Sequence, residues 1–199
     1  MFVCTGNLCR SPLAERLFRS WVERDLGDES RWVRVDSAGT AAAAGPMDLR
    51  SAQALRELGG SPDGAMARQL RSGETADVDL VLTMTREQRR EVLRHDPRGM
   101  RRVFTLAEAA GLLPLIDRTG FDLVPLDERA RELAARLDQA RARRRGGPDD
   151  DIADPIGQPL EVHREVAAHI AGCLRPLTDV LLAGPSRATL PSRLAIGPA

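Results

Sequence analysis

Residues 2–13 read Phe-Val-Cys-Thr-Gly-Asn-Leu-Cys-Arg-Ser-Pro-Leu, and this stretch decides the fold. Its first two residues close a short apolar run that predicts a strand, and a helical pattern begins at Leu13. Between them lie Cys4, five further residues and Arg10. A loop between a strand and a helix N-terminus offers backbone N–H groups and the positive end of a helix dipole to an anion. The stretch therefore predicts a cradle for an oxyanion with a thiol at its centre.

The residues within the loop have the properties that such a cradle requires. Gly6 can adopt backbone angles that other residues avoid, and Asn7 tolerates the left-handed region and can brace the loop with its side chain. Pro12 suits the first position of a helix, where no backbone donor is needed. The guanidinium of Arg10 presents a planar fork to two oxygens of a tetrahedral anion. We therefore expect the anion to be bound by the loop residues Thr5, Gly6, Asn7, Leu8, Cys9, Arg10 and Ser11.

Cys4 lies where a thiol is readily ionised. A helix N-terminus and a neighbouring arginine both stabilise a thiolate, so we expect Cys4 to react in that form. The Ser11 hydroxyl can donate a hydrogen bond to the sulfur and make it a better leaving group. The alternative is a buried structural cysteine with Arg10 on the helix surface, which the other residues of the stretch disfavour. The pattern indicates attack of a thiolate on a phosphorus-like centre.

The composition narrows the class of protein. The chain has 199 residues, 42% of them hydrophobic, which suits one domain with extensions. Its formal net charge is zero, so no nucleic-acid partner is indicated. Its three cysteines are too few and too irregularly spaced for a disulfide framework or a zinc site. The sequence contains no signal-peptide pattern and no long apolar run, so we expect a cytoplasmic protein that does not bind a membrane.

At these residues the chain resembles the low-molecular-weight protein-tyrosine phosphatases, in particular their bacterial branch, whose loop reads V-C-x-G-N-x-C-R-S-P. Residues 3–12 match this pattern fully. The likeness covers most of residues 1–112 and 151–182. It continues in the stretches 35–40 (VDSAGT), 67–70 (ARQL), 79–84 (DLVLTM), 103–106 (VFTL) and 154–155 (DP). The loop and the Asp-Pro pair are the specific parts of the resemblance, and the other stretches support it.

The resemblance implies a two-step hydrolysis of a phosphate monoester through a phosphocysteine intermediate, with no metal or other cofactor. It implies that Cys4 is the nucleophile, that Arg10 binds phosphate and stabilises the transition state, and that Asp154 is general acid and then general base. It also implies that Asn7 and Ser37 brace the loop through hydrogen bonds. The expected partner is a phosphorylated protein or a small phosphomonoester.

The sequence around Asp154 supports the role of proton donor. Thiolate attack on a phosphate monoester needs a proton delivered to the leaving oxygen. Pro155 stiffens the loop that must place this donor. An ordinary turn is the alternative, because Asp96-Pro97 has the same form where a helix ends. Asp154 is favoured because it follows a run of three aspartates and an isoleucine at residues 149–152.

Strand and helix patterns alternate along the chain, which predicts an α/β fold. We expect three layers, with a four-stranded parallel sheet flanked by helices and a phosphate-binding loop after the first strand at the carboxyl edge of the sheet. The first strand is very short, so we expect it either to be frayed or to start upstream. The expected strands are residues 1–4, 31–37, 78–84 and 101–105, and the expected helices are 12–26, 48–58, 85–94, 127–145 and 160–182, the last with a kink or break near Pro176.

The domain boundaries follow from composition and from the resemblance. We expect one phosphatase domain over residues 1–182, with an insertion at about 113–148 that lengthens the chain relative to the family. The arginine-rich helix within the insertion is either a solvated surface helix, which is the plainer interpretation, or a docking arm for a substrate or partner. Residues 183–199 are rich in Ala, Gly, Pro and Ser and are expected to form a disordered tail.

The residues around the phosphate cradle leave the substrate open. Many family members wall the phosphotyrosine ring with aromatic residues, which are replaced here by Ile156-Gly157 and by the alanines at residues 41–44. Protein-tyrosine phosphatase activity is expected from the family. A protein-arginine phosphatase is an alternative that Ile156-Gly157 favours mildly, whereas Leu8 lacks the hydroxyl of the threonine found there in that branch.

Two further alternatives are less favoured. An arsenate reductase of this family needs two more cysteines for a disulfide relay, and Cys173 stands alone on the last helix. An anion-binding module without activity would be expected to lose Cys4, Arg10 or Asp154, and all three are present.

The remaining cysteine, histidine and tryptophan residues carry weaker expectations. Cys9 either packs within the loop or forms a reversible disulfide with Cys4 that protects the thiolate from over-oxidation. The histidines have no partner pattern and are expected on helix surfaces, and the tryptophans are expected in the core: His95, His163, His169, Trp21 and Trp32.

Overall fold

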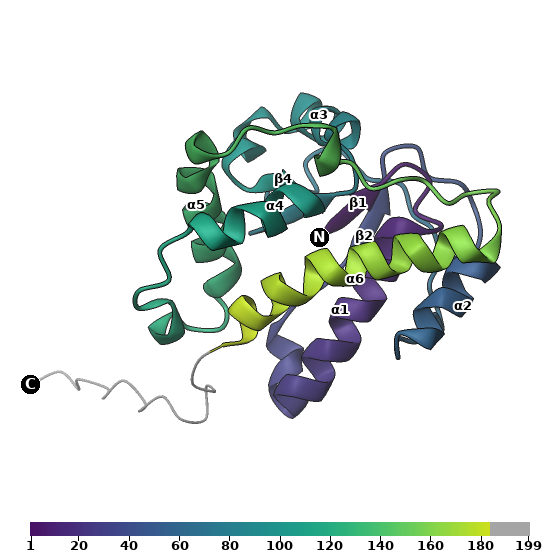
Figure 1. Ribbon diagram of the computed structural model, residues 1–199, viewed down its shortest axis with the longest axis horizontal. Coiled ribbons are helices and arrows are strands. Elements are labelled where there is room, and N and C mark those ends of the chain that lie inside the picture. The colour runs from purple at the N-terminus through teal and green to yellow at the C-terminus, as the bar shows by residue number, and fades with distance from the viewer. Residues whose placement is uncertain (184–199) are drawn as a thin grey trace, which may run out of the picture.

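The computed structural model describes residues 1–183, which form a four-stranded parallel sheet flanked by helices (Figure 1). The strand order is β2-β1-β3-β4, so the chain moves to one side of β1 first and then to the other. The predicted α/β fold and the parallel sheet are confirmed. The strands are β1 (Phe2–Cys4), β2 (Ser37–Gly39), β3 (Val81–Thr83) and β4 (Val103–Thr105).

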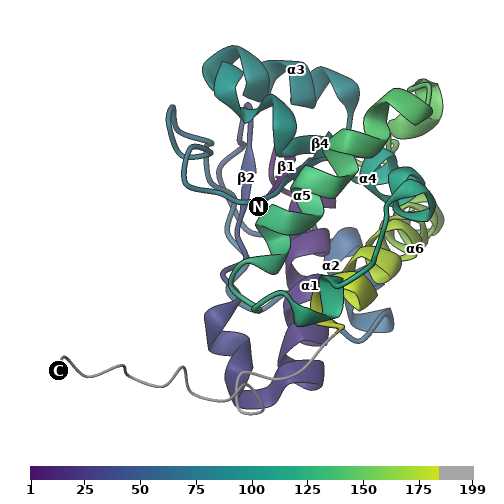
Figure 2. The same cartoon turned by 90° about the vertical axis from the view of Figure 1, so that its left-hand side faces the viewer.

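Helices connect these strands and cover the sheet (Figures 1 and 2). They are α1 (Arg10–Leu26), α2 (Leu49–Glu57), α3 (Arg86–His95), α4 (Leu106–Leu112), α5 (Arg129–Ala140) and α6 (Leu160–Leu182). Short 3-10 turns lie between them at Gly27–Trp32, Pro97–Arg101, Leu113–Leu115, Phe121–Leu123, Arg141–Arg143 and Pro148–Asp150.

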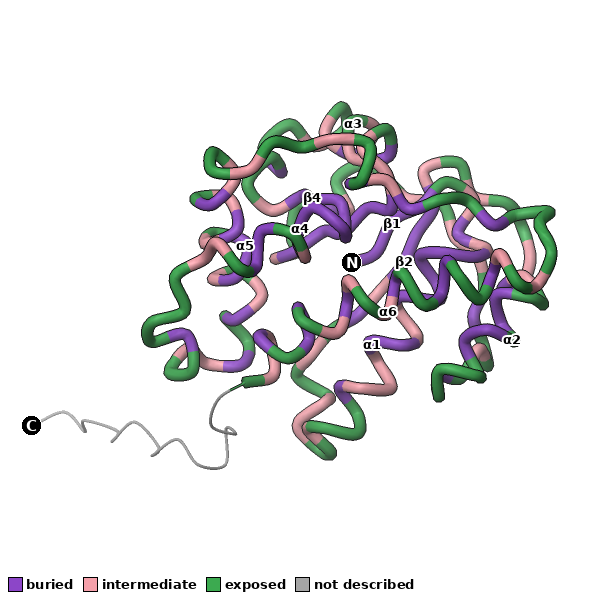
Figure 3. Tube along the Cα trace, in the orientation of Figure 1, coloured by how far each residue is buried: buried purple, intermediate pink, exposed green. Residues whose placement is uncertain are grey.

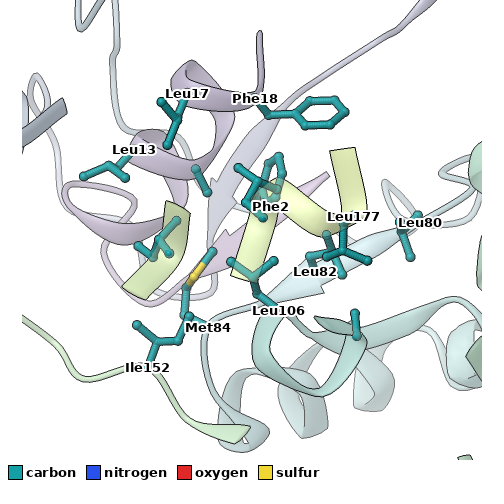
Figure 4. Close-up of a cluster of buried hydrophobic side chains, with 14 of the residues drawn as sticks. Phe2, Leu13, Leu17, Phe18, Leu80, Leu82, Met84, Leu106, Ile152 and Leu177 are labelled. Atoms are coloured by element: carbon teal, nitrogen blue, oxygen red, sulfur yellow. The ribbon is translucent and has the colours of Figure 1, made fainter. Parts of the chain in front are cut away.

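The two faces of the sheet bury different side chains, because successive residues of a strand point to opposite faces. On one face Phe2 and Leu82 join the large core, where Leu13 of α1 and Leu177 of α6 also lie (Figure 4). On the other face the valines of β1, β3 and β4 pack against Val92 of α3. Burial along the chain follows this layering, with the strands buried throughout (Figure 3). The helices thus form layers on both sides of the sheet.

Local capping residues fix where α2 and α3 begin. The Asp48 side chain accepts hydrogen bonds from the backbone N–H groups of Arg50 (2.9 Å) and Ser51 (3.1 Å) at the start of α2. Thr85 and Gln88 form a reciprocal capping box at the start of α3. The predicted starts of these two helices are therefore correct to within a residue.

The strands are shorter than the apolar patterns predicted. The expected strand at residues 31–37 is wrong over most of its length, since Gly27–Trp32 is a 3-10 turn and pairing begins at Ser37. The reason is the length of β1, whose residues Phe2, Val3 and Cys4 pair with Ser37, Ala38 and Gly39. Residues before Ser37 have no strand beside them to pair with. The same limit shortens β3 to Val81–Thr83.

The arginine-rich helix α5 packs into the protein rather than standing free in solvent. Leu133 and Leu137 on its inner face are fully buried in the large core. The Arg141 guanidinium, just after α5, stacks 4.0 Å from the Phe104 ring centroid and donates to the Val103 carbonyl (2.7 Å). These contacts cover the edge of β4, which would otherwise expose unpaired backbone groups. The docking-arm interpretation stays a prediction.

Three expectations are corrected, two of them in the last helix. α6 is continuous from Leu160 to Leu182 with Pro176 inside it, so a break is absent, and the kink that we expected as the alternative stays a prediction. His163 is buried rather than on the surface, because it lies at helical spacing with the buried residues Val166 and Ile170. Trp32 is half exposed rather than in the core.

Two expectations concern the ends of the chain and membrane association. The predicted disordered tail at residues 183–199 lies outside the described residues except for residue 183. Among residues 1–183, none of the helices combines the length and the apolar character that a membrane span requires.

The burial of α5 leads to a stability prediction. Replacing Leu137, which is fully buried, with alanine should lower the free energy of unfolding by about 2–5 kcal/mol, because the change removes apolar contacts and leaves a cavity. Leu123→Ala is the matched control, since Leu123 is 71% exposed, and should change it by less than about 0.5 kcal/mol. Chemical denaturation measures both. Equal effects of the two changes would contradict the packing of α5.

Candidate active site

The loop after β1 is held by its carbonyl groups. The carbonyl oxygens of Cys4, Thr5 and Gly6 accept hydrogen bonds from the backbone N–H groups of residues 40, 41 and 43 at 2.9, 3.0 and 3.1 Å. The Leu8 carbonyl accepts from the Asp48 N–H (2.9 Å). In a trans peptide the N–H points opposite to the C=O, and residues 1–183 contain no cis peptide. The N–H groups of the same peptides therefore face inward, as the Asn7 N–H does toward Cys4 Sγ (3.3 Å).

Position 39 at the end of β2 must be a glycine, because the loop after β1 packs closely against it. A Cβ atom at Gly39 would lie 2.4 Å from the Thr5 carbonyl oxygen, which is a backbone atom that cannot move aside. Gly39 follows Ser37 and Ala38 at the end of β2, in register with Cys4. The Ser-Ala-Gly stretch thus allows the loop and β2 to approach each other.

The Cys4 sulfur lies at the centre of this arrangement and is buried. Ser11 Oγ lies 2.9 Å from Cys4 Sγ. Ser11 Oγ accepts from Asn7 Nδ2 (2.9 Å), so its own proton can point at the sulfur or at the more distant Ala38 carbonyl (3.4 Å). α1 begins at Arg10 with no acidic residue in its first turn and no side-chain cap, so its first N–H groups remain available to an anion. The arrangement suits a thiolate beside a bound oxyanion.

Asn7 braces the loop through every polar atom of its side chain. Its Nδ2 donates to Ser11 (2.9 Å) and Ser37 (3.0 Å), and its Oδ1 accepts from the Arg68 backbone N–H (2.8 Å). Ser37 in turn donates to Glu15 Oε2 (2.6 Å). Asn7 has φ 54°, and within residues 1–183 it is the one non-glycine residue with positive φ. The structure thus brings Asn7 and Ser37 together.

The Arg10 guanidinium connects the phosphate loop to the loop that carries Asp154. Arg10 is buried; its Nη1 donates to the Ile152 carbonyl (3.0 Å), and its Nη2 forms an ion pair with Asp154 Oδ2. The Arg10 guanidinium, which we expected to bind phosphate, therefore binds the Asp154 carboxylate in this structure. A phosphate group would compete with Asp154 for Nη2. Cys4, Arg10 and Asp154 are in any case gathered at one edge of the sheet.

The acid loop, residues 149–155, is anchored by arginines. Asp151 accepts from the Arg86 backbone N–H (2.7 Å) and from Arg86 Nη2 (2.8 Å), and these hydrogen bonds hold the pKa of Asp151 below its usual value. Asp150 is buried and paired with Arg144. The Ile152 N–H donates to the Met84 carbonyl (2.8 Å). These aspartates therefore hold the loop in place instead of forming a solvated linker.

The rim of the cradle is small and aliphatic. The side chains beside it are the alanines at residues 41–44, of which three are exposed, and Ile156, which is half exposed. Thr5 Oγ1 accepts a hydrogen bond from Gln88 Nε2 (3.0 Å), which ties the loop to the start of α3. The residues that border the loop on this side are therefore short or aliphatic.

Cys9 lies behind the loop and not in the cradle. It is buried, and this burial raises the pKa of the Cys9 thiol to about 11, so it is protonated at neutral pH. Cys4, Cys9 and Cys173 are all free thiols. Both interpretations of Cys9 stay predictions.

Several site residues were missed from the sequence. Gln88 follows Thr85 by three residues, a capping-box spacing that was visible. His163 repeats at helical spacing with buried residues, which was also visible. Glu15 and Arg86 carry no local signal, because their partners lie 22 and 65 residues away.

Comparisons with known proteins agree with this geometry. A family model described as low molecular weight phosphotyrosine protein phosphatase matches residues 1–111. The low molecular weight phosphotyrosine protein phosphatase of Schizosaccharomyces pombe is 34% identical over 59% of this chain and 77% of that protein. The protein-arginine-phosphatase of Bacillus subtilis is 38% identical over 91% of this chain and 95% of that protein. Alignments with two further curated relatives span 62% and 59% of their lengths.

A solved structure extends the comparison to the whole fold. It is a mutant of the YwlE arginine phosphatase with a phosphorylated active-site serine. It is 27% identical to this chain, covers 90% of it and 93% of its own length, and superimposes with a TM-score of 0.64.

The Asp151–Arg86 contact predicts a pH-dependent stability. The pKa of Asp151 is lower in the folded state than in the unfolded state. The ionised Asp151 therefore stabilises the folded protein at a pH above its unfolded pKa of roughly 3.9, and this stabilisation is lost as the pH falls through the folded pKa. Asp151→Asn should therefore unfold at lower denaturant concentration than the wild type at pH 7, and the difference should shrink as the pH falls below about 3.9. Asp149→Asn, at an exposed neighbour, is the control. A difference that persists unchanged at pH 3 would contradict the ionic origin.

Proposed function

Since the chain belongs to the low molecular weight phosphotyrosine protein phosphatase family, we propose that it hydrolyses phosphorylated protein side chains through a phosphocysteine intermediate. The observation that carries the proposal is the cradle itself, in which loop N–H groups face inward beside the buried Cys4 sulfur and Arg10 follows at the start of α1. In this proposal Cys4 is the nucleophile, Arg10 and the N–H groups of residues 5–11 bind phosphate, and Asp154 transfers the proton.

In the first step the bond from Cys4 Sγ to phosphorus forms as the bond from phosphorus to the leaving atom breaks. The phosphate takes the place of Asp154 at Arg10 Nη2, and the released Asp154 carboxylate takes up a proton from solvent and delivers it to the leaving atom. Arg10 and the loop N–H groups stabilise the charge on the equatorial oxygens. The Cys4 sulfur then carries the phosphoryl group.

In the second step Asp154 accepts a proton from water, the water oxygen bonds to phosphorus, and the bond to Cys4 Sγ breaks. The Ser11 hydroxyl, 2.9 Å from the sulfur, stabilises the departing thiolate. Inorganic phosphate leaves, and Asp154 releases its proton to solvent and pairs with Arg10 again. The phosphorylated active-site serine of the YwlE mutant supports a covalent step of this kind.

The substrate side chain is phosphotyrosine by family membership, and phosphoarginine is the second candidate. Three observations favour the second: the match to the Bacillus subtilis protein-arginine-phosphatase spans 91% of this chain, the rim at residues 41–44 is alanine, and Ile156 stands after the Asp-Pro pair. Leu8 opposes it, because it offers no hydroxyl.

The cellular setting belongs to the same proposal. A thiolate nucleophile needs a reducing compartment, so we place the enzyme in the cytoplasm of a bacterial cell. Residues 1–182 then form one phosphatase domain, with the insertion at about 113–148 covering the edge of β4.

The test compares three substrates side by side: a small aryl phosphate, a phosphotyrosine peptide and a phosphoarginine peptide. We expect hydrolysis that Cys4→Ser abolishes, with kcat/KM for one peptide at least about tenfold above the other. The release of inorganic phosphate measures kcat/KM for each substrate and the loss of activity in Cys4→Ser. Full activity in Cys4→Ser, or no turnover of any substrate by folded wild-type protein, would refute the proposal.

Asp154 allows a sharper test of the proton transfer. Asp154→Ala should lower kcat for the phosphotyrosine peptide by about two to four orders of magnitude, because the leaving oxygen then departs without a proton. Asp149→Ala, at an exposed residue of the same loop, is the control and should leave kcat unchanged. The loss should be smaller for an aryl phosphate whose leaving group needs no proton. A change below about threefold would assign the proton to another group.

A further inference from the structure

A group of three potential metal ligands lies behind the phosphate loop. Cys9 Sγ, a carboxylate oxygen of Asp48 and His163 Nδ1 all lie within 4.8 Å of one another. They come from the end of the phosphate loop, the N-cap of α2 and the first turn of α6. Cys9 and His163 are buried, and Asp48 is half-buried. Segments far apart in the sequence thus bring a thiol, an imidazole and a carboxylate together.

These donors form a set that Zn²⁺ accepts. Zinc binds cysteine sulfur at about 2.3 Å and histidine nitrogen or carboxylate oxygen at about 2.0–2.2 Å, so its tetrahedral ligands lie roughly 3.3–3.8 Å apart. The distance from His163 Nδ1 to Asp48 Oδ1 is 3.5 Å, which falls in that range. Ser51 Oγ lies 2.8 Å from His163 Nδ1, on the same side of the ring. A movement of less than about 1.5 Å by Cys9 Sγ would complete the set.

The surrounding contacts hold the ligands in place. Asp48 Oδ1 is fixed by the N–H groups of Arg50 and Ser51, and a carboxylate has lone pairs to spare for an ion. The Asp48 N–H donates to the Leu8 carbonyl (2.9 Å), which sets the spacing between α2 and the phosphate loop. The Asp48 side chain is 18% exposed and the next residue, Leu49, is 83% exposed, so the cluster lies close to the surface at this point.

We propose that Cys9, Asp48 and His163 bind one Zn²⁺ ion, with Ser51 Oγ or a water molecule as the fourth donor. On binding, the Cys9 thiol releases its proton to solvent and a zinc–sulfur bond forms, with no change in oxidation state. The ion joins the phosphate loop to α2 and α6 and removes Cys9 from thiol chemistry. The site does not use Cys4, and it does not depend on the proposed phosphatase activity.

The experiment titrates the full chain, freed of metal by a chelator, with Zn²⁺ in a calorimeter and with Co²⁺ in a spectrophotometer. We expect one ion per chain and a thiolate-to-cobalt absorption band. Cys9→Ser, His163→Gln and Asp48→Asn should each weaken binding by at least about 100-fold, since loss of groups that merely orient a ligand already costs 10–100-fold. The absorption band should vanish in Cys9→Ser.

Matched controls separate this site from others. Cys173→Ser and His169→Gln remove a cysteine and a histidine of α6 outside the cluster and should bind as the wild type does. Asp48→Asn preserves the helix cap, because asparagine is an equally good N-cap, and so it tests the carboxylate without unfolding α2. Circular dichroism checks the fold of each variant.

Two results would overturn the proposal. Binding that survives in Cys9→Ser but is lost in Cys4→Ser would place the ion on the catalytic thiol. Absence of binding to the folded wild-type protein, or equal binding by wild type and the well-folded Asp48→Asn variant, would remove the site altogether.

Discussion

The side chain of Asn7 is the constraint on which the site depends. Its left-handed backbone (φ 54°) costs about 1 kcal/mol in a residue other than glycine. Three hydrogen bonds, to Ser11, Ser37 and the Arg68 backbone, the first two of them buried, contribute about 1 kcal/mol each and offset that cost. Because Asn7 turns the chain at this point, the carbonyl groups on both sides of it point outward and the N–H groups inward. The cradle is thus a consequence of one turn that the neighbouring strand and loop hold in place.

The parts of the site that sequence analysis predicted are the local ones. The loop, the helix that follows it and the cap at Thr85 depend on residues within a few positions of one another, so their pattern is visible in the chain. Strand lengths were overestimated, because pairing is limited by the three residues of β1 and not by the alternation at residues 31–37. The partner of an ionised side chain was not predictable either, since Arg86 and Asp151 meet across 65 residues.

His163 shows a different limit of prediction from sequence, which is that the polarity of a residue does not decide its burial. Its spacing with Val166 and Ile170 placed it on the buried face of α6, but its polarity argued for the surface. Buried polar side chains are retained where other groups pair with them, and here Ser51 lies 2.8 Å from its Nδ1. The periodicity of the helix was the better guide than residue polarity. The same holds for the arginine-rich helix α5, whose leucines at helical spacing are in the core although its composition suggested solvent.

The burial of the Arg10 guanidinium constrains the proposed mechanism. A buried guanidinium without a partner would cost several kcal/mol, so some anion must accompany it throughout a reaction cycle. Asp154 is that anion in this structure, and its own exposure of 43% lets it leave without a large rearrangement. In the proposed mechanism, an arriving phosphate carries more charge than a carboxylate and gains the loop N–H groups as well, so it would displace Asp154 from Nη2. Substrate binding would thus release the proposed acid, and the departure of phosphate would return Asp154 to Arg10.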